Sequence, residues 1–317
     1  MAQQAPGRVI QGPPFVRRLG KALRRFWPLY LMMVPGLMYF AVYKYVPMWG
    51  AQIAFKDFAI RKGISGSPWK EPLTYWFTYF FRSPASRQII YNTLILSFSK
   101  LLVCMLPPLI FALAISECRY KTYSRVIQTV SYLPHFLSWV IVYGICVAML
   151  SESTGILNVT LRKMGLQTIP FLTSNSYFRG VLIGSELWKD IGWSSIVYLA
   201  AIMGIDTAMY EAATIDGCGR FRQILHITLP SLGKIFVVLL ITRVGNILDA
   251  GFNQVYVFMN ERVQSTAEII DTWVYTQGLG KMKYSLSTAV GLMKSVLSCI
   301  LVLGTNAIAR RWEGSLW

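Results

Sequence analysis

Charged and aromatic side chains interrupt the fourth long apolar run of the sequence, in the stretch "SELWKDIGW". Glu186, Lys189 and Asp190 stand at i, i+3 and i+4, a spacing that places them on one helical face, where Lys189 can neutralise one or both carboxylates. Trp188 and Trp193 flank them, and aromatic rings stack on sugar faces while charged groups hydrogen-bond sugar hydroxyls. These five residues predict a substrate-binding segment. The alternative is the outer end of a membrane helix, where Trp and charges are ordinary.

A second polar set, Arg243, Asn246, Asp249 and Asn253, recurs at gaps of three, three and four in the fifth apolar run. On a continuous helix this spacing forms one stripe. Charges inside a membrane span usually face a cavity or a partner, because each costs about 2.5–3.5 kcal/mol at mid-membrane. The stripe therefore predicts a wet face that lines a pore, with Arg243 able to pair with Asp249. A polar seam with a neighbouring subunit is the alternative.

Four more polar residues inside apolar runs are weaker candidates: Asn92, Lys100, His135 and Lys294. We expect Lys100 and Lys294 either to snorkel or to neutralise an acid. His135 follows Pro134 in "LPHF", and we expect it to pack at a helix kink rather than to bind a ligand.

No arrangement of residues in the sequence points to catalysis or to a bound metal. The chain has two histidines and no triad, H-E-x-x-H motif or cluster of metal-ligand spacing. The stretches "LGKAL", "SLGKIF" and "GLGKM" lack the leading glycine of a phosphate-binding loop, so we expect no ATP hydrolysis by this chain itself. We expect no cofactor in this chain. A membrane enzyme for lipid-linked sugars would need clustered acids or histidines at the membrane edge, and a channel or receptor is a further alternative.

The composition is that of a protein that crosses a membrane several times. Of 317 residues, 54% are hydrophobic and 14% charged, against about 25% charged residues in soluble domains. The net charge of +17 comes from Lys and Arg clustered at the ends of apolar runs, which indicates membrane-surface electrostatics and not nucleic-acid binding. Five cysteines without paired spacing indicate inert thiols rather than disulfides.

We predict an all-α, polytopic fold with six transmembrane helices over residues 27–317. Residues 1–26 form a basic tail in which "FVRRLGKALRRFW" can lie on the anionic leaflet, or simply orient the first span. The predicted spans are about 27–47, 89–116, 126–150, 180–204, 234–256 and 285–309.

The distribution of charge indicates that both termini are cytoplasmic. Inner segments carry slightly more Lys and Arg, and the outer basic residues are spread over longer loops. In this orientation no cysteine lies in an outer loop. The first outer segment, residues 48–88, contains "SPWKEPLTYWFTYFF" and is suited to an interfacial helix or to partner contact.

The connection between the fourth and fifth spans, residues 205–233, is more ordered than a plain loop. Asp206 can cap a helix "TAMYEAATI", and Asp216-Gly217 breaks it. A second helix, "RFRQILHI", carries an apolar stripe and is expected to end at Pro230. The stripe must be buried either by a partner or by this protein's own helix ends.

This segment resembles the EAA motif of ABC-importer permeases, E-A-A-x-x-x-G-x(9)-I-x-L-P. The matching residues are Glu211, Ala212, Ala213, Gly217, Ile227, Leu229 and Pro230. Longer stretches, among them "LYLMMVPGLMYF", "SYLPHFLSWVIVYG" and "LWKDIGW", resemble the maltose-type sugar permeases. "AEIIDTWVYTQGL", "YSLSTAVGLMKSV" and the terminal "SLW" are similar to the subgroup importing oligosaccharides from pectin- and alginate-type polysaccharides.

The resemblance implies a type I ABC-importer fold in a bacterial inner membrane. It implies three kinds of partner: a second homologous permease subunit in a heterodimer, two ATPase subunits that bind ATP and Mg²⁺, and an extracytoplasmic solute-binding protein. The 205–233 loop would dock on the ATPase, with Glu211 in contact, Gly217 as the elbow, and Leu229-Pro230 passing movement to the fifth span. The expected coupling set also includes Asp216, Arg220 and Phe221.

Two positions depart from the usual pattern, and one alternative stays open. Cys218 stands where Ala is common, and His226 is expected to be a surface residue. Trp188-Lys189 falls on the family's "WK" position beside the translocation path. A permease of the same class for a non-sugar solute, such as phosphate or a polyamine, is the nearest alternative.

Overall fold

Helices form the regular structure of the computed structural model, which describes residues 25–310. Among these residues the only β pairing is an isolated antiparallel bridge between Lys56 and Trp69. The chain separates into two compact units, Met1–Gln52 and Ile53–Trp317, and each is described by itself. The predicted all-α class is confirmed.

The first unit contains the first predicted span. Helix α2 (Trp27–Phe40) begins with Pro28 in its first turn, where the missing N–H costs nothing. A π-helical turn (Ala41–Tyr45) and α3 (Val46–Met48) continue it. The stretch Trp27–Phe55 is long and apolar enough to cross a membrane. The predicted basic tail lies outside the described residues except for its last two positions.

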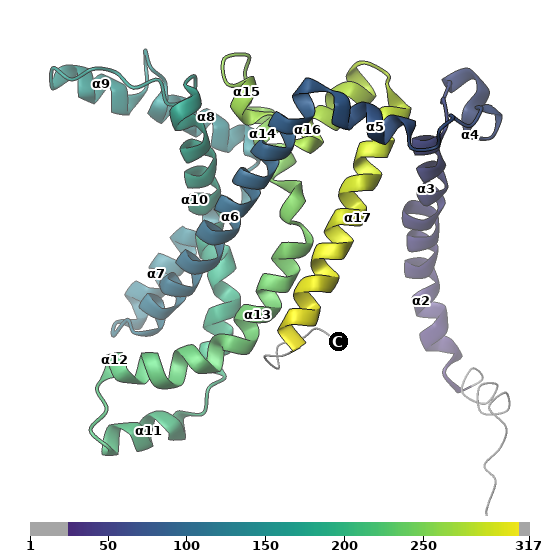
Figure 1. Cartoon of the computed structure of the whole chain (residues 1–317). Coiled ribbons are helices and arrows are strands. Elements are labelled where there is room, and N and C mark those ends of the chain that lie inside the picture. Colours follow the sequence, from purple (N-terminus) through teal and green to yellow (C-terminus); the bar gives the residue numbers. More distant parts are fainter. Residues whose placement is uncertain (1–24, 311–317) are drawn as a thin grey trace, which may run out of the picture. The chain divides into compact units, whose positions relative to one another are not determined.

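Four long helices dominate the second unit (Figure 1). They are α6 (Pro84–Ser116), α10 (Asn175–Met203), α13 (Leu229–Gly245) and α17 (Tyr284–Ala309). Shorter helices connect them: α4 (Gly63–Gly66), α5 (Tyr75–Arg82), α7 (Lys121–Tyr132), α8 (Trp139–Leu150), α9 (Ile156–Lys163), α11 (Thr207–Ile215), α12 (Arg220–Gln223), α14 (Phe252–Phe258), α15 (Gln264–Ala267) and α16 (Ile270–Tyr275).

The described chain contains four helical stretches that can cross a membrane, or up to six if each of two bent helix pairs is one span. This agrees with a polytopic protein and allows the predicted number of spans. Helices α6 and α10 pack along each other, and α13 packs on α17. Leu96 of α6, Val142 of α8, Leu182 of α10 and Val255 of α14 meet in one buried cluster.

The third predicted span, 126–150, is not one straight helix. A 3₁₀ turn (Leu133–Phe136) ends α7, and the helices on either side of it meet at 107°. Pro134 lacks the N–H that a continuing helix needs. Ser138 then starts α8, because its hydroxyl accepts a hydrogen bond from the Ile141 amide at 3.3 Å.

The fifth predicted span, 234–256, is displaced and broken. Pro230 does not end a helix as expected: it lies in the first turn of α13, and α12, a π turn (Ile224–Thr228) and α13 form one helical stretch over Arg220–Gly245. Beyond Gly245 a 3₁₀ turn (Ile247–Asp249) interrupts the span, and α14 follows in a new direction.

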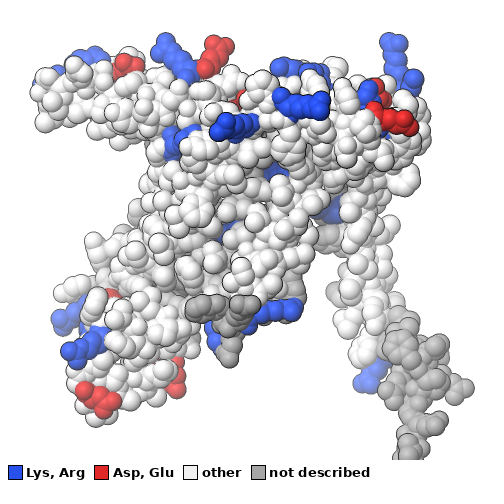
Figure 2. Space-filling view, in the orientation of Figure 1, with Lys and Arg blue, Asp and Glu red and all other residues white. Residues whose placement is uncertain are grey.

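Charged side chains of the second unit gather at two opposite ends and leave few between them (Figure 2). One end carries α5, α9, α15 and α16, and the other carries α11 and α12 (Figure 1). The intervening surface has many exposed apolar side chains, such as Phe98, Ile110 and Val197. Such a band fits contact with lipid or with another membrane subunit.

Candidate functional site

Lys100 occupies the break in the fifth span. Its ammonium group, on α6, donates to the carbonyl oxygen of Ala250 at 3.0 Å, to Glu186 Oε2 on α10 at 2.8 Å, and to Gln254 Oε1 on α14. The side chain of Lys100 is 9% exposed and that of Glu186 21%. A carbonyl released from its helix needs a new donor when buried, and Lys100 supplies it. The expectation that Lys100 neutralises an acid is confirmed.

The backbone at the break adopts left-handed conformations at two consecutive residues. Ala250 has φ of +48° and Gly251 has φ of +81°. A non-glycine residue at positive φ is uncommon and is held only where its surroundings fix it. Glycine is favoured at position 251 by its positive φ, and a Cβ atom there would lie 2.5 Å from Lys100 Nζ, so Lys100 would have to move from its hydrogen bonds. The break in the fifth span is therefore stabilised by specific residues.

Gln254 ties the segment after the break to α10. It is fully buried, and its amide donates to the carbonyl oxygen of Leu182 at 2.7 Å and to the hydroxyl of Ser185 at 2.9 Å. The amide oxygen accepts from Lys100. Because both ends of this amide are satisfied, α14 is held to α10 in a defined register.

Residues from both predicted polar sets meet in one cavity, which we call the central cavity. It has a volume of about 270 Å³ beside the Lys100–Glu186 pair, and Arg243, Asn246 and Asp249 also line it. Arg243 does not pair with Asp249 as expected; its guanidinium donates to the Ser194 hydroxyl of α10 at 2.9 Å. Helix α13 ends between Arg243 and Asp249, so the two residues do not share one helical face.

Among residues 25–310, five predicted substrate-path residues lie outside the lining of the central cavity; two of them, Lys189 and Asp190, are described in the next paragraph. The other three are Trp188, Trp193 and Asn253. Asn253 is exposed on α14. The break separates this helix from α13, so Asn253 does not continue the stripe that was predicted for one helix. Both tryptophans are partly exposed in the middle of α10, not at a helix end as the alternative reading required.

Lys189 does not neutralise the carboxylates near it in the sequence. Its ammonium group donates to the backbone carbonyl oxygens of Pro134, at 3.4 Å, and His135, where α7 is broken from α8. Asp190 instead contacts His135 Nδ1 at 2.9 Å, and the His135 ring stacks on Trp193 with centroids 4.5 Å apart. The kink-packing role expected of His135 is confirmed, and Lys189 belongs to the same kink.

A second polar cavity, the side cavity, adjoins the central one. It has a volume of about 370 Å³ and is lined by Asn246, Asp249, Asp271 and Lys294, among others. Lys294 Nζ lies 2.5 Å from Asp271 Oδ2 and 3.9 Å from Asp249 Oδ1. Lys294 thus neutralises an acid, as predicted, and Asp249 borders both cavities.

The 205–233 connection has the predicted cap, first helix and glycine turn, whereas its second helix continues into α13; we call residues 206–230 the elbow. Asp206 caps α11 by accepting from the Ala208 amide at 3.0 Å. Gly217 has φ of +74°, and the Cys218 amide donates to the Ala213 carbonyl oxygen at 2.8 Å, which closes the turn.

Three hydrogen bonds that sequence reasoning missed connect the parts of the elbow. The Gln223 side-chain amide donates to the Thr214 hydroxyl at 2.9 Å and to the Cys218 carbonyl oxygen at 3.2 Å. The Tyr210 and Thr228 hydroxyls lie 2.9 Å apart, so α11 is tied to the π turn before α13. Displacement of α11 would therefore be transmitted to α13.

Much of the elbow's apolar surface is uncovered. Ile215 is 87% exposed and Phe221 77%, while Met209 and Leu225 are each 49% exposed. Glu211, Ala212, Asp216, Arg220 and Pro230 are also exposed, whereas Ala213, Ile227 and Leu229 are half-buried. The alternative that the stripe packs on the protein's own helix ends does not hold for Phe221. A large exposed apolar group at a charged helix end is typical of an interaction surface.

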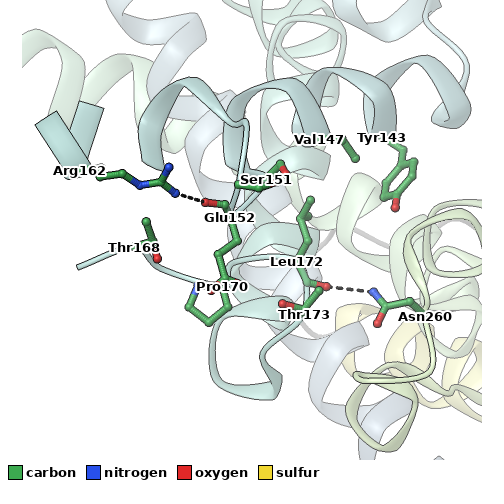
Figure 3. Close-up of a pocket in the computed structure, with 11 residues that line it drawn as sticks. Tyr143, Val147, Ser151, Glu152, Arg162, Thr168, Pro170, Leu172, Thr173 and Asn260 are labelled. Carbon is green, nitrogen blue, oxygen red and sulfur yellow. Dashed lines mark hydrogen bonds between the residues drawn. The ribbon is translucent and has the colours of Figure 1, made fainter. Parts of the chain in front are cut away.

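The opposite end carries an outer cavity of about 520 Å³ between the end of α8, the chain before α10 and the chain after α14 (Figure 3). Arg162 donates to the Glu152 carbonyl oxygen at 3.3 Å, and Asn260 donates to the Leu172 carbonyl oxygen at 3.0 Å. The side chain of buried Asn158 holds the wall with four hydrogen bonds to the backbone. No motif in the sequence marked this cavity.

Comparison with known proteins places this geometry in a family. Residues 86–314 match the family described as binding-protein-dependent transport system inner membrane component. The chain is 43% identical to protein LplB of Bacillus subtilis, over 92% of this chain and 91% of that protein. It is 42% identical to the polygalacturonan/rhamnogalacturonan transport system permease protein YteP of the same organism, over 90% and 88% of the two chains.

A solved structure agrees with the fold. A chain of a bacterial ABC transporter involved in the import of the acidic polysaccharide alginate superposes with a TM-score of 0.86 and 40% identity. The alignment covers 93% of this chain and 99% of that one. The chain is thus a membrane subunit of a transport system and not a membrane-embedded enzyme: it belongs to the family of binding-protein-dependent transport system inner membrane components.

Proposed function

We propose that this chain forms half of the translocation path of an ATP-driven importer for oligosaccharides derived from acidic polysaccharides. The single observation that carries the proposal is the central cavity, where Lys100, Glu186 and Arg243 from three helices meet at a broken span. Transporters place substrate sites at such discontinuous helices. The names of the pectin-type permease and the alginate importer supply the substrate class.

The chemistry of the central cavity suits a uronate-containing sugar. Glu186 and Asn246 offer acceptors and donors for hydroxyl groups, and Arg243 offers a planar pair of N–H donors for a carboxylate. The Lys100–Glu186 pair is internally neutral. Of the other charged lining residues, Arg243 supplies the positive charge on α13 and Asp249 a negative charge beyond the end of that helix. We infer that Arg243 exchanges Ser194 for the substrate's carboxylate.

Partners complete the transporter in this proposal. A second homologous permease subunit closes the other side of the path, and an extracytoplasmic solute-binding protein delivers the sugar to the end that carries α9. Two ATPase subunits, which bind ATP and Mg²⁺, cover the exposed elbow residues such as Ile215 and Phe221. Both termini then lie in the cytoplasm, and the bilayer surrounds the apolar band.

The path from ATP to sugar runs along one helix. The ATPase subunits move the elbow through Glu211 and the exposed apolar group. Because α12 continues through the π turn into α13, this movement reaches Gly245 and the break that borders the central cavity. Leu229 and Pro230 lie at the start of α13, where the π turn allows the helix to shift. The result is alternating access of the cavity to the two sides.

The test is ATPase stimulation in proteoliposomes that contain the complete complex and its binding protein. We expect oligogalacturonates to stimulate ATP hydrolysis and to be taken up, and neutral maltooligosaccharides to do neither. If no oligosaccharide stimulates ATP hydrolysis although the binding protein is functional, the assignment to sugars is rejected. Stimulation by neutral sugars alone would reject the acidic class. An importer of a non-sugar solute would respond to neither set.

A further inference from the structure

The end that carries α9 and α15 contains another cavity besides the outer cavity. Its walls are mostly aromatic, and we call it the aromatic cavity. Its volume is about 340 Å³, within the range of small-ligand sites. It lies between the chain at Asp57, helix α5 and the start of α17. Aromatic side chains of Phe58, Tyr75, Trp76, Tyr79 and Tyr284 form most of the wall.

Contacts between distant parts of the chain fix these walls. The amide of Phe58 donates to the Ser285 hydroxyl of α17 at 3.0 Å. The indole N–H of Trp76 donates to the Lys56 carbonyl oxygen at 3.0 Å. The rings of Phe58 and Tyr284 meet edge to face, with centroids 5.8 Å apart. The cavity is therefore preformed, so a ligand would not have to order it.

Asp57 and Lys283 are the charged residues that line the aromatic cavity, and Lys70 pairs with Asp57 beside it. Lys70 Nζ lies 3.2 Å from Asp57 Oδ2, and the two side chains are 30% and 54% exposed. Lys70 also lies 4.9 Å from the centroid of the Tyr75 ring. Met282, in the cavity wall, has φ of +55°, a conformation that non-glycine residues rarely adopt outside sites fixed by function or packing. Asp57, Lys70 and Lys283 thus offer donors and acceptors next to exposed aromatic rings.

We propose that the aromatic cavity binds one sugar ring of the incoming oligosaccharide, before the sugar reaches the central cavity. The proposal rests on the proposed function. The apolar face of a pyranose packs on rings such as Tyr79, which is 46% exposed, while its hydroxyl groups exchange hydrogen bonds with Asp57 and Lys70. Ordinary interfacial aromatics face lipid headgroups. Here they converge on a cavity that is also lined by Asp57, the partner of Lys70.

A site of this kind favours longer sugars. A long oligosaccharide bound to the solute-binding protein can place a protruding sugar ring in the aromatic cavity. Because the oligosaccharide is already held in the complex, its local concentration at the aromatic cavity is high. A disaccharide enclosed by the binding protein gains nothing from the site. The aromatic cavity would therefore set a preference for chain length.

The experiment measures saccharide binding by saturation-transfer NMR to the complete transporter complex in nanodiscs without binding protein, with pentagalacturonate as the probe. We expect binding to weaken about fivefold or more in Tyr79→Ala and to be kept in Tyr79→Phe, which retains the ring. Tyr177→Ala is the matched control, because Tyr177 is also 46% exposed, packs on Phe171, and lies outside the aromatic cavity. We expect this control to bind as the wild type does.

Uptake in proteoliposomes gives the second readout. We expect Tyr79→Ala to lower uptake of pentagalacturonate relative to digalacturonate. Equal binding by Tyr79→Ala and wild type would overturn the proposal, as would equal losses in Tyr79→Ala and Tyr177→Ala. Impaired uptake with unchanged saccharide binding would assign the cavity to a protein partner and also overturn it. If wild type takes up no galacturonate of either length, the proposed function fails instead.

Discussion

Lys100 Nζ lies 3.0 Å from the carbonyl oxygen of Ala250 and holds open a break in the fifth span. The same ammonium group pairs with Glu186 at 2.8 Å. One lysine thus fixes the unwound backbone and neutralises an acid of the central cavity. The two functions are joined, because a change at the break alters the electrostatics of the cavity.

Replacing Lys100 tests this link. Lys100→Met leaves both the Ala250 carbonyl oxygen and Glu186 without their cation, and we expect a loss of about 3 kcal/mol in stability and a lower melting temperature in detergent. Lys100→Met with Glu186→Gln should recover part of the loss. Lys121→Met, at an exposed position that begins α7, is the control. A double variant no more stable than Lys100→Met would contradict the pairing.

Gly251 should tolerate no side chain. Gly251→Ala combines a φ of +81° with a Cβ only 2.5 Å from Lys100 Nζ, so we expect a loss of about 1 kcal/mol or more and reduced uptake. Gly233→Ala, in α13, meets no atom within 4 Å and should be neutral or slightly stabilising. Thermal unfolding of the purified complex measures both. Equal melting temperatures for the two variants would argue against a constrained break.

Stability should depend on pH through Glu268, in the chain between α15 and α16. Burial raises the pKa of this carboxyl above its ordinary value of 4.5. The native state then binds its proton more tightly than the unfolded state, so stability is greatest below the ordinary pKa and falls as pH rises. We expect Glu268→Gln to raise the melting temperature at pH 8 but not at pH 4.5. Glu261→Gln, at an exposed site, is the control; an equal effect there would contradict burial as the cause.

Arg243 should govern substrate charge. Because Arg243 lines the central cavity, Arg243→Gln should reduce uptake of oligogalacturonate about tenfold or more, with a weaker effect on ATP hydrolysis in the absence of substrate. Arg162→Gln, on the outer cavity, is the control. Unchanged uptake by Arg243→Gln would remove the carboxylate-binding role from this residue.

The sequence predicted local structure well where one segment determines it. The cap at Asp206, helix α11 and the turn at Gly217 follow from neighbouring residues, and all three are present. The four clear spans follow from apolar length. Pro230 was misjudged because the first turn of a helix tolerates proline as readily as the position after its end.

The partners of the buried charges could not be predicted in the same way. Lys189 and its neighbouring carboxylates share a helical face, yet each finds its partner on another helix. A break at Ala250, a non-glycine residue with positive φ, leaves no local signal, because it depends on Lys100 from α6. Such contacts are decided by packing between helices far apart in the sequence.

The elbow provides the most direct test of the account, since it links ATP hydrolysis to transport. Gly217→Val places a branched side chain at φ of +74°, whereas Gly219→Val changes a nearby glycine whose φ is −69° and which also meets no atom within 4 Å. The measurement is uptake of oligogalacturonate per ATP hydrolysed in proteoliposomes of the complete complex. We predict that Gly217→Val, like Glu211→Ala, assembles in the membrane but loses most uptake, while Gly219→Val keeps it. Normal uptake per ATP in both Gly217→Val and Glu211→Ala would contradict the account.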